Sequence, residues 1–168
     1  IIRDVLMDTG LRVSEICALN VGDLRPIGPN LALQVLAKGS VPAELPLSRA
    51  IAQGLMEWLA YRVQKRGSEL LPEEPLFIDQ HGQRYLRTGL AAMVLRIGEA
   101  AGITRFPVTP HVLRHTLELI RRRAKIDPSV RSRLLTHTSF SSLAHYQHVL
   151  PEELNQAREQ QTSELLRY

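Results

Sequence analysis

Strong β-strand signals in this chain are confined to one stretch, residues 28–48, and this restriction limits the folds that it can adopt. The segments "LALQVLA" and "ELPL" within that stretch flank a Lys-Gly-Ser-Val-Pro turn, a pattern typical of a small β-hairpin or meander. Most of the remaining chain shows apolar residues spaced three and four apart, which predicts amphipathic helices. The sequence therefore predicts a mainly α-helical domain with a small antiparallel β-sheet, of the α+β class.

The helices themselves follow from the apolar spacing and from capping residues. We expect them at about 1–8, 12–20, 48–67, 88–101, 109–124, 128–135, 140–147 and 152–166, with a short strand and turn within 73–88. Trp58 falls on the inward face of the helix over 48–67, together with Leu55 and Leu59. We therefore interpret Trp58 as a core residue rather than as a stacking platform.

Composition limits the class of protein. The 168 residues, 44% of them apolar, suit one compact domain, and no apolar run is long enough to span a membrane. No basic-then-apolar signal segment opens the chain. A single cysteine, Cys17, excludes an internal disulfide and a cysteine-based metal cluster, and its apolar neighbours favour a plain core thiol. These features fit a reducing compartment, and we expect a cytoplasmic location.

The formal net charge of +4 permits a polyanionic partner without requiring one. The chain opens without Met on "IIRDVLMDTG", which reads as the middle of a helix. We therefore expect that an N-terminal portion of the natural protein precedes it.

The stretch "HVLRHT", residues 111–116, places two histidines and an arginine at the start of one predicted helix. Thr109 supplies its N-cap and Pro110 its first position. At about 100° per residue, a buried stripe forms from Leu113, Leu117, Ile120 and Ala124, and a polar face forms from His111, Arg114, His115, Glu118, Arg121 and Lys125. The helix N-terminus favours an anion, and a phosphate would suit this face.

Two other interpretations of this face remain open at this point. It can be a solvated polar surface, or His111 and His115 can be a metal pair. The metal pair is disfavoured because Arg114 between them would repel a cation and no glutamate completes the H-E-x-x-H pattern. Other parts of the chain add Arg12, Lys38, His137 and Tyr146, and the combined set can cut a phosphodiester without a metal ion.

These residues, in this order, resemble the catalytic domain of the tyrosine recombinase (phage integrase) family. The match runs through "TGLRVSE", "AKG", "HVLRHT", "LLTH" and "HYQHV", and it covers nearly the whole chain. The spacing is the specific part. Arg114 lies three positions after His111, and His137 lies 23 after Arg114. Tyr146 lies nine after His137, again as in that family.

The resemblance implies site-specific DNA recombination, in which double-stranded DNA is cut and rejoined through a 3′-phosphotyrosine without a cofactor. It implies a catalytic set of Arg12, Lys38, His111, Arg114, His137 and Tyr146. Arg12 and Arg114 would clamp the phosphate, because a guanidinium can hold two non-bridging oxygens at once. Tyr146 would be the nucleophile, and Lys38 on the hairpin turn would protonate the leaving oxygen.

Other residues receive secondary roles. Glu15 is three positions from Arg12 and would orient it, with a simple surface contact as the equal alternative. His115 would support its neighbours, and Arg121 and Lys125 would touch the DNA backbone. Arg122 and Arg123 are expected to be solvated charges. His145 and His148 are interpreted as local packing and hydrogen-bonding groups.

The resemblance also implies the domain organisation and the assembly. The chain 1–168 would be a single C-terminal catalytic domain, truncated at its N-terminus, and the family's N-terminal core-binding domain would be absent from it. The final helix would dock on a neighbouring protomer within a tetramer on DNA. A loosely held terminal helix is the alternative, because its apolar face is thin.

Two departures from the family pattern keep rival functions open. Thr136 stands where the family has glycine, which costs roughly 1–2 kcal/mol if the backbone is left-handed there. The hairpin after Lys38 carries Val41, Ala43 and Glu44 in place of further basic residues. These departures leave a DNA-binding accessory module with weakened catalysis as one alternative. The other is a type IB topoisomerase-like relaxation activity, because such enzymes use a similar catalytic set.

Overall fold

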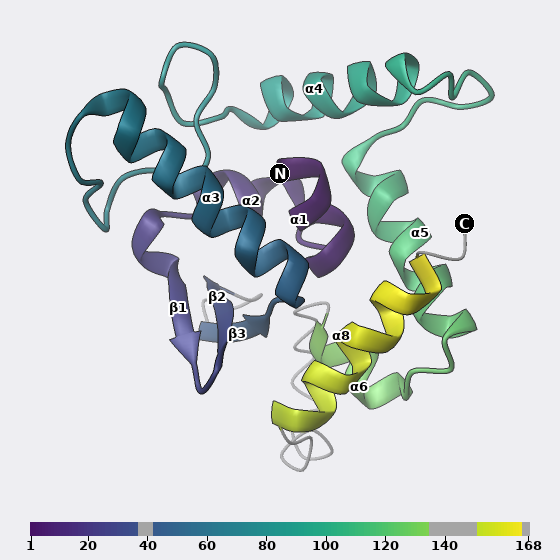
Figure 1. Cartoon of the computed structure of the whole chain (residues 1–168). Coiled ribbons are helices and arrows are strands. Elements are labelled where there is room, and N and C mark those ends of the chain that lie inside the picture. The colour runs from purple at the N-terminus through teal and green to yellow at the C-terminus, as the bar shows by residue number, and fades with distance from the viewer. Residues whose placement is uncertain (37–41, 135–150, 166–168) are drawn as a thin grey trace.

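The computed structural model describes residues 1–36, 42–134 and 151–165. Its elements are α1 (Ile2–Thr9), α2 (Val13–Ala18), the 3-10 turn η1 (Val21–Asp23), β1 (Leu24–Ile27), β2 (Asn30–Leu36), β3 (Pro42–Pro46), α3 (Arg49–Arg66), α4 (Arg87–Ala100), α5 (Pro110–Arg123), α6 (Pro128–Leu134) and α8 (Pro151–Leu165). The domain is mainly helical with one small sheet (Figure 1), which confirms the predicted class. The helix expected over 140–147 lies outside the described residues.

The sheet is antiparallel, with strand order β1-β2-β3. Leu33 of β2 pairs with Leu24 on one side and with Leu45 on the other, and Leu33 and Leu45 are both buried. The hairpin predicted from residues 28–48 is thus formed by β2 and β3. β1 was not predicted, and residues 73–88 form only the isolated bridges Asn20↔Pro75 and Ile78↔Arg84.

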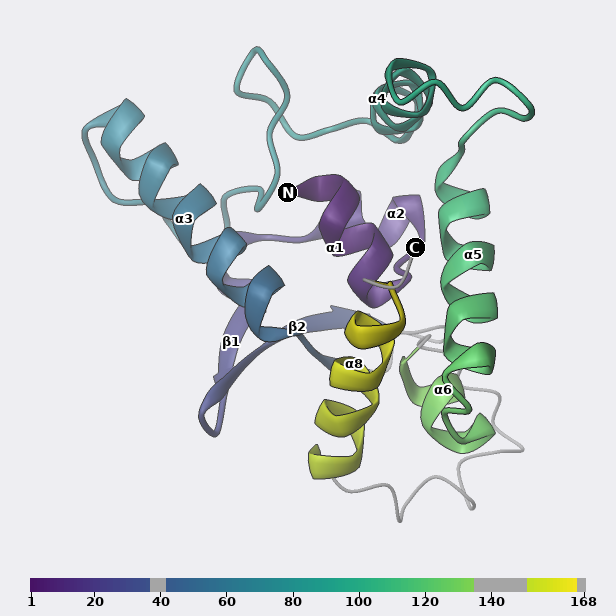
Figure 2. The same ribbon diagram turned by 45° about the vertical axis from the view of Figure 1, so that its right-hand side comes forward.

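Most of the buried apolar side chains belong to one core around α1. Helix α1 lies among α2, α3 and α5 (Figures 1 and 2). Val5 and Leu6 of α1, Ile16 of α2 and Leu55 of α3 are its buried representatives. A second, smaller cluster joins α6 to α8. Trp58 is half-buried against the first core and donates Nε1–H to the Leu76 carbonyl over 2.8 Å, as expected for a packing residue.

The last helix, α8, is packed against the rest of its own chain. It contacts α5, α6 and β3, and Figure 2 shows it below α1. Leu154 and Ala157 are buried as predicted, and the polar side chains of Arg158 and Gln161 are buried beside them. The alternative of a loosely held terminal helix is therefore wrong, because the thin apolar face is widened by these two polar residues.

No helix in the described part of the chain is both long enough and apolar enough to cross a bilayer. The half-buried Cys17 packs against the first core. Burial raises the pKa of its thiol, against the opposing charges of Arg84 and Arg87. The thiolate is therefore disfavoured, which agrees with a core thiol rather than a nucleophile.

Candidate active site

The position of Arg12 is set by the tight connection between α1 and α2. Gly10 adopts a left-handed conformation, with φ of 72°, and its N–H donates to the Leu6 carbonyl. A side chain at this φ would cost roughly 1–2 kcal/mol, so glycine suits the position. Leu11 then enters the core, and Arg12 becomes the N-cap of α2.

Glu15 holds Arg12 through both the backbone and the side chain. Its Oε2 accepts from the Arg12 N–H over 2.6 Å, and its Oε1 accepts from Arg12 Nη1 over 2.8 Å. The Glu15 side chain is only 13% exposed, whereas that of Arg12 is 41% exposed. The two side chains therefore form a partly buried pair, and the surface contact considered as the alternative is wrong. The Arg12 guanidinium keeps one side open to solvent.

Helix α5 presents its functional residues through a capped N-terminus. The Thr109 Oγ1 accepts from the Val112 N–H over 3.2 Å, and Pro110 occupies the first helical position, as predicted. Leu117 and Ile120 are buried in the predicted stripe. This packing fixes the rotation of α5 about its axis and so the directions of its polar side chains.

Arg114 links α5 to the segment that carries Arg12. Its Nη1 donates to the carbonyl of Gly10, two residues before Arg12. Burial lowers the pKa of the Arg114 guanidinium, the nearby charge of Arg12 lowers it further, and Glu15 and Glu118 oppose the change. Two arginines 102 positions apart in the chain thus meet at one corner of the fold, where an added anion would relieve their mutual repulsion.

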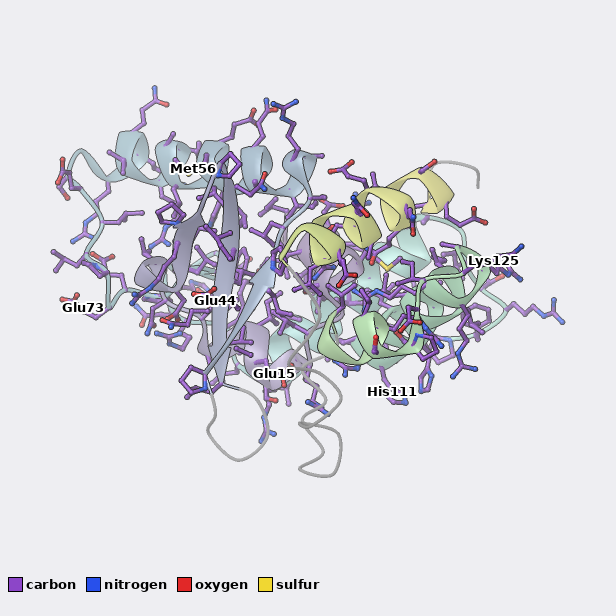
Figure 3. The ribbon with its side chains drawn as sticks, turned by 90° about the horizontal axis from the view of Figure 1, so that it is seen from below. Glu15, Glu44, Met56, Glu73, His111 and Lys125 are labelled. Atoms are coloured by element: carbon purple, nitrogen blue, oxygen red, sulfur yellow. The ribbon has the colours of Figure 1, made fainter. Side chains whose placement is uncertain are left out.

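His111 and His115 form a close pair on the exposed side of α5. Their Nε2 atoms lie 2.8 Å apart, and their rings meet edge to face with centroids 4.2 Å apart. One nitrogen must therefore carry a proton that the other accepts. In the part of the chain that the structure describes, no group of three potential ligands could hold a metal ion. Figure 3 shows Glu15 and His111 on the same side of the molecule.

Three members of the predicted catalytic set lie outside the described residues: Lys38, His137 and Tyr146. Thr136 lies there as well. The structure therefore brings Arg12, Glu15 and Arg114 together, with His111 and His115 on the first turns of the same helix as Arg114. The catalytic roles of all these residues stay predictions.

Comparison with known proteins decides the family. A sequence profile of the Phage integrase family matches residues 1–153. The chain belongs to this family. The tyrosine recombinase XerD of Bifidobacterium longum is 32% identical over 150 residues, covering 87% of this chain and 48% of that protein. The tyrosine recombinase XerC of Roseiflexus castenholzii is 33% identical over 155 residues, covering 87% and 46%.

Solved structures show the same fold. The XerH site-specific recombinase bound to its difH substrate superposes with a TM-score of 0.69 at 22% identity, covering 93% of this chain and 44% of that one. The integrase of mycobacterium phage Brujita gives a TM-score of 0.68 at 23% identity, covering 95% and 50%. This integrase-family chain thus has the fold of a tyrosine recombinase catalytic domain, and it spans about half the length of the relatives that it matches.

Arg121 of this integrase-family chain does not have the role that its spacing predicted. It lies on the same face of α5 as Arg114, but that face is covered by the end of α1 and by α8. Its side chain is fully buried and donates to Gln161 Oε1 over 2.7 Å and to the carbonyls of Asp8 and Thr9. The prediction of a DNA contact at Arg121 is therefore wrong.

Lys125 is exposed just beyond α5 and has a left-handed backbone, with φ of 56°. At 1.5 Å per residue it lies about 16 Å along the helix direction from Arg114, too far to touch the same phosphate. A contact between Lys125 and another phosphate stays a prediction. Arg122 and Arg123 are exposed, and their role as solvated charges stays a prediction.

Sequence reasoning missed the polar residues that surround the end of α1, namely Asp8, Arg158 and Gln161, which are all buried. Their spacing does not predict that they are buried, because nothing in the sequence of either helix distinguishes them from exposed polar residues. Only the approach of α8 to α1, 150 positions away in the chain for Arg158 and Asp8, brings them together.

Proposed function

We propose that this protein carries out site-specific DNA recombination by cutting and rejoining double-stranded DNA through Tyr146, without a metal ion or ATP. The observation that supports this most strongly is the contact of Arg114 with the Gly10 carbonyl. It joins the helix of one predicted clamp residue to the turn that carries the other, Arg12. Family membership supplies the second support, since tyrosine recombinases XerC and XerD are among the relatives.

In the proposed reaction, the Tyr146 oxygen attacks a backbone phosphorus atom. A bond between that oxygen and phosphorus forms, and the bond between phosphorus and the 5′ oxygen of the next nucleotide breaks. The products are a 3′-phosphotyrosine ester and a free 5′-hydroxyl. Rejoining reverses these steps with the 5′-hydroxyl of another strand as nucleophile, so the energy of the phosphodiester is retained.

Arg12 and Arg114 would stabilise the negative charge that grows on the non-bridging oxygens in the transition state. Loss of one such preorganised donor typically costs on the order of 10²–10³ in rate. A histidine, His111 or His137, would accept or share the proton that leaves Tyr146, with His115 supporting His111. Lys38 would deliver a proton to the departing 5′ oxygen.

The proposed partner is double-stranded DNA, held by a homo-oligomer, with action in the cytoplasm at the nucleoid. The remainder of the natural protein would supply a core-binding domain, in keeping with relatives about twice as long. A tetramer linked through the C-terminal helix is part of the proposal. Because α8 is packed against its own chain, such a link would use the face of α8 that stays exposed, which carries Glu153, Gln156, Glu159 and Gln160.

The test is a covalent trapping assay with a nicked DNA that carries the cognate site, using this chain and the full-length protein. The wild-type protein should give a protein–DNA adduct that survives denaturant. Tyr146→Phe should abolish the adduct and leave DNA binding intact, because only the phenolic oxygen is removed. An undiminished adduct in Tyr146→Phe would exclude Tyr146 as the nucleophile.

The same assay separates the rival functions. A DNA-binding accessory module would bind the site and give no adduct with either protein. A topoisomerase-like enzyme would give the adduct and relax supercoiled DNA, yet would not exchange strands between two sites. Recombination requires the adduct together with exchange of strands between partner DNAs.

A further inference from the structure

The C-terminal end of α1 is held by side chains from two distant helices. The last four carbonyls of a helix have no partner within the helix and must find one elsewhere. In α1 these belong to Leu6, Met7, Asp8 and Thr9. The Gly10 N–H satisfies the carbonyl of Leu6. The other three accept hydrogen bonds from side chains of α5 and α8.

Helix α8 contributes Arg158 and Gln161. Arg158 Nη1 donates to the Asp8 carbonyl and lies 3.9 Å from the Asp8 carboxylate oxygen Oδ2. Gln161 Nε2 donates to the same carbonyl over 3.0 Å and to that of Met7 over 3.4 Å. Both side chains are almost wholly buried, with 1% and 0% exposed. These contacts are made at the end of α1, where the turn that leads to Arg12 begins.

Helix α5 contributes Arg121 from the opposite side. Its Nη2 donates to the Asp8 carbonyl over 3.2 Å and to the Thr9 carbonyl over 3.3 Å. Its Nε donates to Gln161 Oε1 over 2.7 Å, so the two helices are joined to each other at the end of α1. Almost two turns earlier on α5 and on the same face, Arg114 continues the series by donating to the Gly10 carbonyl.

Burying these arginine side chains costs free energy, which indicates a role beyond packing. Burial and repulsion from Arg158 lower the pKa of Arg121 to about 9, and burial lowers the pKa of Arg158 as well. Arg121 Nη1 is paired with Glu118 Oε1 only at 3.6 Å. Within the described part of the chain, this atom and Arg158 Nε and Nη2 have no hydrogen-bond partner. Apolar residues of similar volume often replace a buried charged group without loss of stability. The negative end of the α1 dipole offsets part of the cost.

The end of α1 leads directly to the predicted phosphate clamp. Only Gly10 and Leu11 separate Thr9 from Arg12, and Leu11 is buried, with its N–H donating to Thr9 Oγ1 over 3.2 Å. The Arg12 N–H is in turn fixed by Glu15. Each backbone group between the held carbonyls and Arg12 thus has a defined place, so a shift at the end of α1 is passed on to the guanidinium.

We propose that Arg121, Arg158 and Gln161 are positioning residues, which hold the end of α1 so that Arg12 and Arg114 face the same phosphate. The proposal rests on the proposed function for the meaning of the clamp. It assigns to α8 a part in building the active site within its own chain. A displacement of about 1 Å at a catalytic group can lower a rate by on the order of 10², so loose anchoring should be visible in kinetics.

The first test measures the rate of adduct formation at saturating nicked DNA for Arg158→Met and for the control Leu154→Ala. Leu154 is a buried residue one turn away on α8 that belongs to the cluster with α6. At a temperature where both variants are folded, Arg158→Met should lower the rate by about 10- to 100-fold with little change in DNA affinity. Leu154→Ala should keep the wild-type rate. Equal rates for the two variants would overturn the proposal.

Three further variants distinguish a positioning role from a purely structural effect of the substitution. Arg158→Lys retains a cationic donor and should recover part of the rate, and Gln161→Met should cause a smaller loss of the same kind. In an Arg12→Lys background, Arg158→Met should cost much less than in the wild type, because the residue through which it acts is already changed. An undiminished further loss in that background would overturn the proposal.

A readout independent of catalysis separates this proposal from the proposed function. Amide hydrogen exchange should speed up at Arg12 and Ile16 in Arg158→Met, because these amides depend on the capped start of α2. In Leu154→Ala the faster exchange should stay within α6 and α8. If the wild type forms no adduct, the proposed function fails, and the exchange pattern alone still supports or overturns the positioning role.

Discussion

Glu15 serves two purposes with its two carboxylate oxygens. One oxygen caps the start of α2 by accepting from the Arg12 N–H, and the other holds the Arg12 guanidinium. The backbone and the side chain of the same arginine are therefore fixed by a single residue. A carboxylate is needed for both contacts, because a carboxamide has only one acceptor oxygen.

We predict that Glu15→Gln weakens both stability and DNA cleavage. The unfolding free energy should fall by about 1 kcal/mol, as for loss of a helix cap, and the rate of adduct formation should fall because the Arg12 guanidinium loses its fixed direction. Urea denaturation and the trapping assay measure the two effects. Glu57→Gln on the exposed face of α3 is the matched control and should change neither. If Glu15→Gln forms the adduct at the wild-type rate, Arg12 does not need its contacts with Glu15 and this prediction is wrong.

The prediction for Arg121 from sequence was half right, and the reason is physical. Helical geometry correctly placed Arg121 on the face of Arg114, since seven residues make almost two full turns. Geometry within one helix does not show what covers that face. The partners of Arg121 are two carbonyls of α1, 113 and 112 positions away, and the side-chain amide of Gln161 on α8, 40 positions away. No local spacing reveals them.

At the scale of the secondary-structure elements, α5 depends on its N-terminal cap. Thr109 Oγ1 satisfies one of the free N–H groups at the helix start, and Pro110 needs none. His111 and Arg114 lie in the two turns that follow. An α5 that frays at this end would move both side chains.

Thr109→Ala is expected to lower the unfolding free energy by about 1 kcal/mol, and Thr109→Ser to keep most of it, because a serine hydroxyl can accept the same hydrogen bond. Chemical denaturation of the three proteins measures the difference. Equal stability of the alanine and serine variants would show that the Thr109 hydroxyl does not cap α5.

Helix α4 is held to the connector before α5 by a close approach at Gly98. A Cβ placed on Gly98 would lie 2.5 Å from both Cβ and Cγ2 of Val108, closer than any real contact. Gly98→Ala should therefore lower the unfolding free energy by about 1–3 kcal/mol, since α4 must move away. Gly89→Ala on the same helix meets only Tyr85 Cδ1 at 3.9 Å and should instead be neutral or stabilising. Thermal unfolding of both variants checks the contrast.

The elements predicted from the sequence were those with strong internal signals. Apolar periodicity located the described helices to within one or two residues at most ends. β1 was missed because "LRPI" contains a proline and two exposed residues, so it has no apolar alternation of its own. It is a strand only because β2 lies beside it. Ser48 occupies the expected N-cap of α3, but its side chain makes no capping bond, and its N–H donates to the Asp8 carboxylate instead.

At the scale of the whole molecule, the formal charge of +4 permits the proposed DNA partner without indicating where DNA would bind. Phosphate contacts release counterions, so the affinity of this protein for DNA should fall steeply as salt rises. The slope of the logarithm of affinity against the logarithm of salt concentration is proportional to the number of phosphate contacts. It therefore provides a test of single lysines that needs no structure of the complex.

Lys125→Ala should reduce the magnitude of the salt slope by about 1 if Lys125 touches a phosphate. Lys65→Ala, which removes an exposed lysine on α3 whose Nζ lies near the Tyr61 ring, should leave the slope unchanged. Binding titrations over a series of salt concentrations give both slopes. A Lys125→Ala slope equal to that of Lys65→Ala would remove Lys125 from the DNA interface.

The whole-molecule features that sequence reasoning reached were the family, the class of fold and the order of most helices. The packing position of α8 could not be predicted from the sequence. The apolar residues of that helix are few, and its firm packing depends on Arg158 and Gln161 meeting carbonyls of α1. Polar residues of this kind look like surface residues in a sequence, because what buries them is a backbone surface formed elsewhere.

The meeting of position 8 with positions 158 and 161 has a consequence for how the protein is made. A ribosome releases α1 long before it has translated α8, so this part of a growing chain exists for a time without the support of Arg158 and Gln161. If these residues position Arg12 as proposed, the arginine would acquire its working orientation only after α8 has been made. A nascent polypeptide without α8 would then hold the proposed clamp less firmly than the folded domain does.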